Sequence, residues 1–407
     1  MLAEIPAILI LVGIAAYIVL AGADFGAPFW TLTARGEQAE KIRQQTHRSM
    51  APVWEANHVW LIFVLVVCWT AYPEVFGSLF STLWIPLLLA ALGIVLRATS
   101  YVVGGEADRP VVVWISTASS LLAPFFLGTV IGAIAGGTVP LGNAAGDPIT
   151  SWLNPVSITV GILAVIFCAY LAAVYLAAVY LAADANRSGN PDLADAFRTR
   201  AIAAGVVSGL VAVAGLLVMG TDDSSIYDGL VSGGGLVAVI ISGLAGIGAR
   251  VLLVARKFSG ARVAAALATA AVVAGWGLAQ SPDILPGLTI DEAAAPDNVI
   301  IALLFAIGVG LLVLIPSIAL LYGLVLEGRF DTGTGEGASP AGSQVRPIDH
   351  PERRAVLGVL ALLGGGALLS LSMDGGFFLY LGVLMLFAGV VAGAITLARS
   401  LLHTAAD

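Results

Sequence analysis

The sequence has little charge and few cysteines. Only 11% of its 407 residues are charged, whereas an average soluble domain carries about 25%. Its two cysteines, Cys68 and Cys168, both fall inside apolar runs, which argues against a disulfide framework and gives no metal-ligand spacing. The sequence also lacks a Walker A loop, a Rossmann fingerprint, a CxxC pair and a nucleophile elbow. No soluble cofactor and no covalent catalysis are therefore indicated.

Long apolar runs dominate the chain instead. Hydrophobic residues make up 59% of it, and eleven segments are long enough to cross about 30 Å of hydrocarbon at a rise of about 1.5 Å per residue. The sequence thus predicts an all-α polytopic membrane protein with about eleven helices. The first run has no basic region before it and no clear cleavage site, so we expect a retained helix and not a signal peptide. The expected spans are 5–25, 56–72, 79–103, 111–136, 155–183, 199–219, 235–254, 261–280, 298–325, 355–372 and 375–399.

The basic residues lie on one side of these spans. All 18 Lys and Arg residues fall within or beside the loops that follow the odd-numbered spans, and the opposite loops carry only acidic residues. Under the positive-inside rule this bias places the N-terminus outside and the C-terminus in the cytoplasm. The predicted location is a bacterial or archaeal cytoplasmic membrane.

The chain is expected to divide late in its length. Residues 331–352 are rich in Gly, Ser and Pro, a composition typical of flexible linkers. We expect a nine-helix domain over 1–330, this cytoplasmic linker, and a C-terminal two-helix extension over 353–407 to which the sequence assigns no role.

The second span opens with an unusual group of polar and aromatic residues. Glu55, Asn57 and His58 lie between Trp54 and Trp60 at the entrance of the apolar run. Ionisable groups at this depth are costly and are candidates for function. The alternative is that the tryptophans are interface anchors and that Glu55 is only a polar helix start.

Three charged residues are expected at one depth near the cytoplasmic face. Asp24 ends the first span, Glu55 begins the second, and Arg97 lies about two turns from the cytoplasmic end of the third. They could form a buried ion network, or the carboxylates could form a proton entry path. The sequence alone leaves both open, because structural ion pairs also perturb pKa values.

A haem ligand is harder to find. Of the four histidines, His47, His350 and His403 fall in loops or the tail, and only His58 lies at membrane depth. A single histidine can ligate haem iron, but buried polar groups generally need hydrogen-bond partners. We favour a hydrogen bond from His58 to Asn57 or to a neighbouring helix, and predict that this chain alone binds no haem and no metal.

A third polar group lies on the outer side. Trp276 and Gln280 end the eighth span, and a proline-bounded stretch follows. The simplest interpretation is a loop with Trp276 as an interface anchor.

These segments resemble subunit II of the cytochrome bd-type quinol oxidases. Gly22 to Gly26 resembles the family motif at the end of its first helix, and Pro52 to Trp60 resembles its tryptophan motif. Trp276 to Gln280, followed by Leu288-Thr289 and Ala293 to Pro296, resembles the outer loop of the cyanide-insensitive branch. The resemblance covers about residues 1–325.

The chain departs from the family pattern at three places. The first family aspartate falls on Ala21, while the second falls on Asp24. Glu55 and Ala56 stand where the family has Asp and Gly. A carboxylate remains at two of the three acidic positions, which keeps a proton route in place but leaves its detailed path in doubt.

The resemblance implies two four-helix bundles plus peripheral helices, paired with a homologous subunit I that carries haem b, haem d and the quinol site. It implies quinol oxidation coupled to reduction of O2 to water, with protons drawn from the cytoplasm. Asp24 and Glu55 match candidate proton-path acids, and Arg97 matches a basic position after the third helix. Subunit II is expected to support assembly and to hold a structural quinone. The expected partners are subunit I, small accessory subunits, lipid and quinol, and no nucleic acid.

Two other classes stay open at this point, a secondary transporter and a non-catalytic membrane assembly subunit. Glycine-rich breaks at 233–235 and 363–366 would suit a transporter. The intramembrane charges gather near the cytoplasmic face and not at the midplane, however, which counts against one.

Overall fold

The computed structural model describes residues 2–33, 54–102, 110–186, 191–221 and 225–326, with a few isolated positions after 357. The chain divides into two units, Met1–Gly308 and Val309–Asp407. Apart from those isolated positions, the predicted linker and the predicted spans 355–372 and 375–399 lie outside the described residues, so the count of eleven helices stays a prediction.

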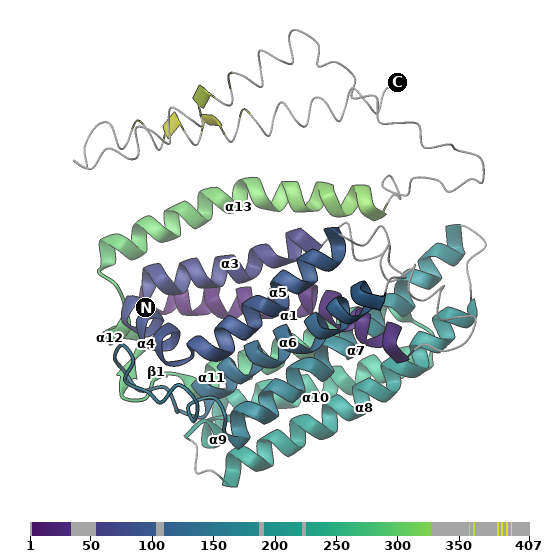
Figure 1. Cartoon of the computed structure of the whole chain (residues 1–407), viewed down its shortest axis with the longest axis horizontal. Helices are drawn as coiled ribbons and strands as arrows, with labels where there is room; N and C mark the ends of the chain where they lie inside the picture. Colours follow the sequence, from purple (N-terminus) through teal and green to yellow (C-terminus); the bar gives the residue numbers. More distant parts are fainter. Residues whose placement is uncertain are drawn as a thin grey trace. The chain divides into compact units, whose positions relative to one another are not determined.

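Each of the first nine predicted spans corresponds to a long helix in the described part of the chain (Figure 1). Seven of these helices are long and apolar enough to cross a membrane by themselves, and α3 qualifies together with the short helix that follows it. The all-α multi-pass fold is thereby confirmed. The nine helices are α1 (Glu4–Thr33), α3 (Trp54–Ala71), α5 (Trp84–Val102), α6 (Pro110–Ala135), α7 (Pro155–Asn186), α8 (Pro191–Thr221), α10 (Gly233–Val254), α11 (Phe258–Gln280) and α13 (Asp297–Leu326).

One predicted boundary is wrong. The expected span 79–103 begins inside α4 (Pro73–Thr82), a separate helix that follows α3 after a bend of 120°. Pro73 opens α4 because proline suits the first position of a helix and has no N–H to continue the preceding one. The third span itself starts only at Trp84.

Short elements connect some of the long helices of unit 1. α9 (Ser225–Leu230) precedes α10, and a two-stranded antiparallel hairpin of β1 (Asp283–Leu285) and β2 (Leu288–Thr289) follows α11. The hairpin leads into α12 (Ile290–Ala293), which begins with a capping box. The stretch expected to be a loop is therefore an ordered hairpin and helical turn.

The helices pack as two groups of four. α1, α3, α5 and α6 form one group, and α7, α8, α10 and α11 form the other, with α7 packed against both α1 and α6. Close approach of α1 to α7 depends on Gly26, where an added Cβ would lie 1.9 Å from the carbonyl oxygen of Cys168. Small residues allow membrane helices to approach this closely.

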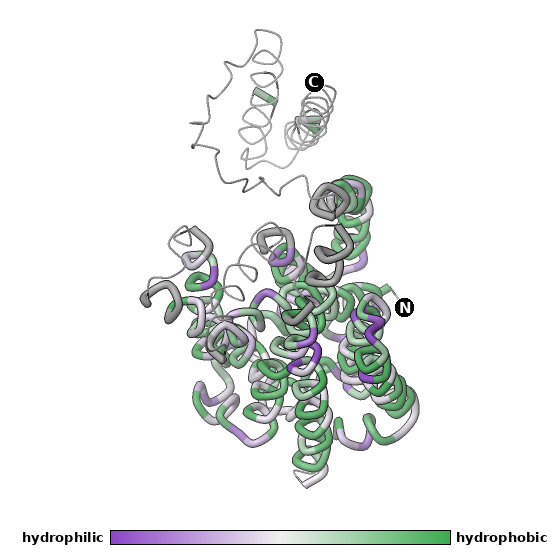
Figure 2. Tube along the Cα trace, turned by 90° about the vertical axis from the view of Figure 1, so that its right-hand side faces the viewer, coloured by the Kyte–Doolittle hydropathy of each residue, from purple (hydrophilic) through white to green (hydrophobic). Residues whose placement is uncertain are grey.

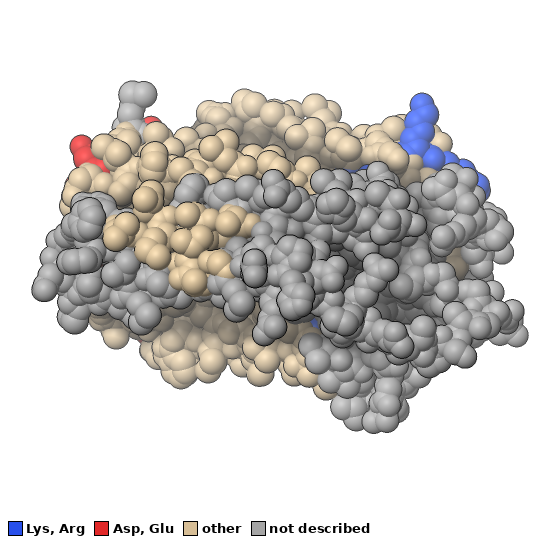
Figure 3. Space-filling view, turned by 90° about the horizontal axis from the view of Figure 1, so that it is seen from above, with Lys and Arg blue, Asp and Glu red and all other residues tan. Residues whose placement is uncertain are grey.

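The surface agrees with a membrane location. Apolar residues cover most of the length of the helices (Figure 2), and large side chains on α8 and α10 such as Leu210, Leu217 and Leu244 are exposed. In the view of Figure 3, acidic side chains lie toward one end of the described surface and basic side chains toward the other. The uncharged band between them is the region that lipid would cover.

Candidate functional site

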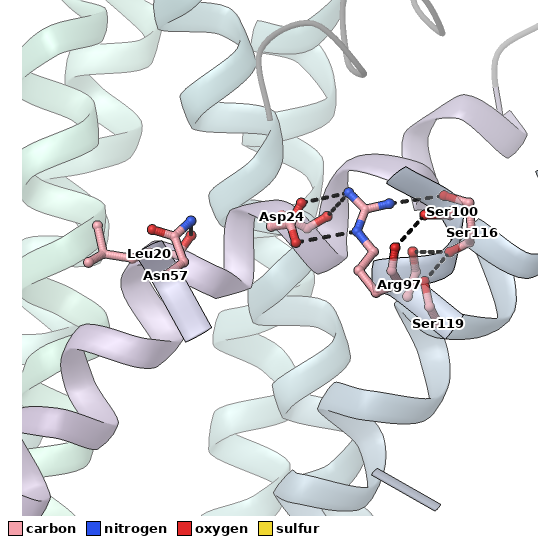
Figure 4. Close-up of polar contacts among 8 residues, drawn as sticks. Leu20, Asp24, Asn57, Arg97, Ser100, Ser116 and Ser119 are labelled. Carbon is pink, nitrogen blue, oxygen red and sulfur yellow. Dashed lines mark hydrogen bonds and ion pairs between the residues drawn. The ribbon is translucent and has the colours of Figure 1, made fainter. Parts of the chain in front are cut away.

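A buried ion pair joins α1 to α5. Arg97 Nη2 lies 2.6 Å from Asp24 Oδ1, and Arg97 Nε lies 3.3 Å from Oδ2 (Figure 4). Asp24 is 0% exposed and Arg97 is 4% exposed. A bidentate contact of this kind fixes the guanidinium relative to the carboxylate, and both charged groups are buried away from solvent.

A proline in α1 gives this arginine a third acceptor. The carbonyl oxygen of Asp24 would ordinarily accept from the N–H four residues later, but that residue is Pro28, which has none. Arg97 Nη2 donates to this carbonyl at 2.8 Å. The arginine therefore binds the side chain and the backbone of Asp24 together.

A serine hydroxyl contacts the guanidinium on the side away from Asp24, and further serines lie nearby. Arg97 Nη1 donates to Ser116 Oγ on α6 at 3.0 Å, and Ser100 Oγ donates to the carbonyl oxygen of Arg97 at 2.7 Å (Figure 4). Ser119 Oγ and Ser120 Oγ both donate to the carbonyl oxygen of Ser116. The sequence interpretation missed these serines, although several hydroxyl residues in succession inside an apolar span were a readable signal.

The tryptophan motif reaches α1 through Asn57 and His58. Asn57 is buried and donates from Nδ2 to the carbonyl oxygen of Leu20 at 3.2 Å, one helical turn before Asp24. The His58 ring makes edge contacts with Tyr17 and Phe25, with ring centroids 5.8 and 5.5 Å away. Both residues thus hold α3 against the face of α1 that leads to Asp24.

The other residues of that motif are only partly described. Trp60 packs against the cluster that contains Tyr17 and Phe25. Trp54 and Glu55 begin α3, but their side chains lie outside the described part of the structure. The predicted meeting of Asp24 and Arg97 is found, and the contribution of Glu55 stays a prediction.

An apolar cavity of about 340 Å³ lies between the two helix groups. Its walls come from α1, α3, α6, α7 and α11, and Trp276 and Gln280 lie on them. Among the described residues, Trp276 Nε1, Gln280 Oε1 and the Tyr17 hydroxyl are buried without a hydrogen-bond partner. The predicted outer motif therefore faces a cavity and not only the membrane interface.

Comparison with known proteins identifies the family. The family model for cytochrome bd terminal oxidase subunit II matches residues 2–325. The chain belongs to this family. The bd oxidase structure from Geobacillus thermodenitrificans matches with a TM-score of 0.66 and 26% identity, covering 80% of this chain and 98% of that one. The resemblance inferred from the three motifs and the predicted helical fold are both confirmed.

Two Bacillus subtilis (strain 168) subunit II proteins match over shorter regions. One is named Putative cytochrome bd menaquinol oxidase subunit II and is 26% identical over 222 residues, which is 53% of this chain and 62% of the relative. The other is named Cytochrome bd ubiquinol oxidase subunit 2 and is 25% identical over 166 residues, which is 40% of this chain and 48% of the relative. The matched regions span less than two thirds of either relative.

Proposed function

We propose that this chain is subunit II of a bd-type terminal oxidase, a complex that oxidises quinol and reduces O2 to water. The observation that carries this proposal is the family match over residues 2–325. The coverage of nearly the whole subunit in the Geobacillus oxidase supports it further. We propose a homologous subunit I as the partner, with small accessory subunits beside it and lipid around it.

The haems and the quinol-oxidising site are proposed to lie in subunit I. Of the four histidines, the sequence places only His58 at membrane depth, and the His58 ring makes edge contacts with Tyr17 and Phe25. A haem at this position would compete with both rings for space. Among the described residues, no three His, Cys, Asp or Glu side chains gather where they could hold a metal ion.

The cavity suits a structural quinone. Its wall is almost entirely apolar, as an isoprenoid tail requires, and Trp276 Nε1 and Gln280 Oε1 are a donor and an acceptor four residues apart on α11. The indole N–H would donate to a quinone carbonyl, and the amide oxygen would accept from the hydroxyl of the quinol form. A bound quinone would supply a two-electron, two-proton couple. Solvent extraction of Trp276→Phe and parental complexes, followed by chromatography, tests the assignment, because equal quinone content in both would contradict it.

The buried charges support a second role, proton delivery from the cytoplasm. Asp24 is 0% exposed and pairs with Arg97. Buried carboxylates near one membrane face are a recurrent component of proton routes. We propose that Glu55 and Asp24 form the entry, with Arg97 as ion partner, and that the end of the chain carrying these residues faces the cytoplasm.

The test of the main proposal is a spectrum. The full chain, tagged and purified from membranes in mild detergent, should co-purify with a second multi-span protein. The preparation should show haem bands in its reduced-minus-oxidised spectrum, and it should oxidise quinol with uptake of O2. A preparation of this chain that is free of haem and of any partner, yet moves a solute across vesicles, would favour a transporter and contradict the proposal.

A further inference from the structure

A group of hydroxyls inside α6 has no part in the function described so far. Four of the five residues from Ser116 to Ser120 carry a hydroxyl, in a helix whose other residues are apolar except for Thr129. Ser119 is 0% exposed and Ser120 is 3% exposed. We call Ser116, Ser119 and Ser120 the α6 hydroxyl cluster.

The hydroxyl oxygens of Ser119 and Ser120 keep unused acceptor capacity. Ser119 Oγ donates to the carbonyl oxygen of Ser116 at 2.6 Å, and Ser120 Oγ donates to the same oxygen at 2.9 Å. With their hydrogens used in this way, the two hydroxyl oxygens can only accept. Within the described ranges no protein group donates to either of them.

A proline adds a further acceptor one turn away. The carbonyl oxygen of Ser120 would accept from the N–H of residue 124 in a regular helix, but that residue is Pro124. Buried acceptors of this kind are normally met by protein donors or by internal water, which brings two donors and makes about three hydrogen bonds. Water is a donor of suitable size for these oxygens.

The cluster continues directly from the ion pair. Ser116 Oγ accepts from Arg97 Nη1, and Arg97 binds Asp24. At its other end, Pro124 lines the apolar cavity. The hydroxyl residues thus extend about one helical turn from the ion pair, and Pro124 on the cavity wall lies one further turn along α6, at about 5.4 Å per turn.

We propose that the α6 hydroxyl cluster holds a short chain of water molecules that extends the proton path beyond Asp24 and Arg97. Ser116 acts as a positioning residue, because its hydroxyl oxygen holds the guanidinium from the side opposite Asp24. A proton moves along the chain as each water accepts one proton and releases another, so no oxidant or reductant is needed. This inference rests on the proposed role in proton delivery.

A purely structural role makes different predictions. Serine hydroxyls in membrane helices often bond their own backbone three or four residues earlier and pack without water. In that case replacement by alanine removes local bonds only, and the rate of proton-coupled turnover does not change.

The first part of the experiment is a high-resolution cryo-EM map of the intact oxidase. We expect solvent density within hydrogen-bond distance of Ser119 Oγ or Ser120 Oγ. A map that resolves ordered water elsewhere in the membrane interior, but none at these oxygens, overturns the proposal. This result does not depend on the assembly of any variant.

The second part compares variants of the assembled complex. Ser119→Ala/Ser120→Ala should lower turnover about tenfold or more, as expected for loss of a positioned proton-transfer step, and should increase the H2O/D2O rate ratio. The matched control is Ser157→Ala/Ser208→Ala, which also removes two buried hydroxyls but lies on α7 and α8, and it should turn over at the parental rate. A parental rate in the cluster variant overturns the proposal. If the alanine variant does not assemble, the same comparison is made with Ser119→Cys/Ser120→Cys, which keeps the side-chain shape.

Asp24→Asn, measured in parallel, distinguishes failure of the water chain from failure of the proton-delivery role. If Asp24→Asn slows turnover and the cluster variant does not, only the water chain is refuted. If the Asp24→Asn and cluster variants both turn over at the parental rate, the proton-delivery role and the water chain are both refuted.

Discussion

Replacing Arg97 by methionine should strongly destabilise the complex. Asp24 is fully buried and would lose its ion pair with Arg97. Removal of one member of a buried ion pair typically costs about 3–5 kcal/mol, because the other charge stays behind uncompensated. We expect Arg97→Met to assemble poorly, or to lose its haem absorbance at a much lower denaturation temperature than the parent.

The double variant Asp24→Leu/Arg97→Met should recover most of that stability. Exchange of a whole buried ion pair for apolar residues of similar size is often neutral or favourable. The carbonyl oxygen of Asp24 would still lack the donor that Arg97 supplies, at a cost of about 1–3 kcal/mol. Adding Pro28→Ala restores an N–H at the position that serves this carbonyl, and should recover this remaining part.

Thermal denaturation of the purified complexes, followed by haem absorbance, measures all four proteins. The expected order of stability is the single variant lowest, then the double, then the triple near the parent. A single variant as stable as the parent would refute the energetic reasoning, and so would a double variant no more stable than the single. Turnover then separates structure from function, since an assembled double variant with the parental rate would make the ion pair purely structural.

Three further outcomes are expected. His58→Ala should leave the haem content of the complex unchanged, and loss of a haem band in its spectrum would overturn the assignment of the haems to the partner. Single cysteines at Asp147 and Asp223 should react with an impermeant reagent from outside and one at Arg43 should not, and the reverse pattern would contradict the orientation. Hydrogen bonds from Thr289 lower the pKa of Glu292. The backbone amides of the hairpin turn should therefore be protected from hydrogen exchange above the ordinary carboxylate pKa and lose that protection as the pH falls through the lowered value. Exchange that is independent of pH, after correction for intrinsic rates, would argue against this prediction.

The helices were readable from the sequence because long apolar runs are a strong signal. The separation of α4 from α5 was not, because the break at Leu83 falls inside the stretch 79–103, which averages as one apolar span. The hairpin was missed because its strands have only three and two residues. Such short strands are set by tertiary contacts and leave no periodic pattern.

The candidate site was partly predictable for similar reasons. Asp24 and Arg97 were expected at one depth because each lies near the predicted cytoplasmic end of its span. Their direct contact depends on helix rotation, which an almost uniformly apolar helix does not reveal. The third bond to Arg97 required both the position of Pro28 and the three-dimensional approach of α5. The cavity beside Trp276 arises from seams between helices and has no local signature.

Proton uptake during a single turnover tests the central claim most directly. The oxidase is reconstituted in vesicles with its cytoplasmic side toward a pH-sensitive dye, and parental, Glu55→Gln and Glu55→Asp proteins are compared from pH 6 to 8. If Glu55 relays protons, Glu55→Gln should slow uptake about tenfold or more, while Glu55→Asp keeps much of the parental rate and haem content is equal in all three. Uptake by Glu55→Gln at the parental rate across this pH range would contradict the account.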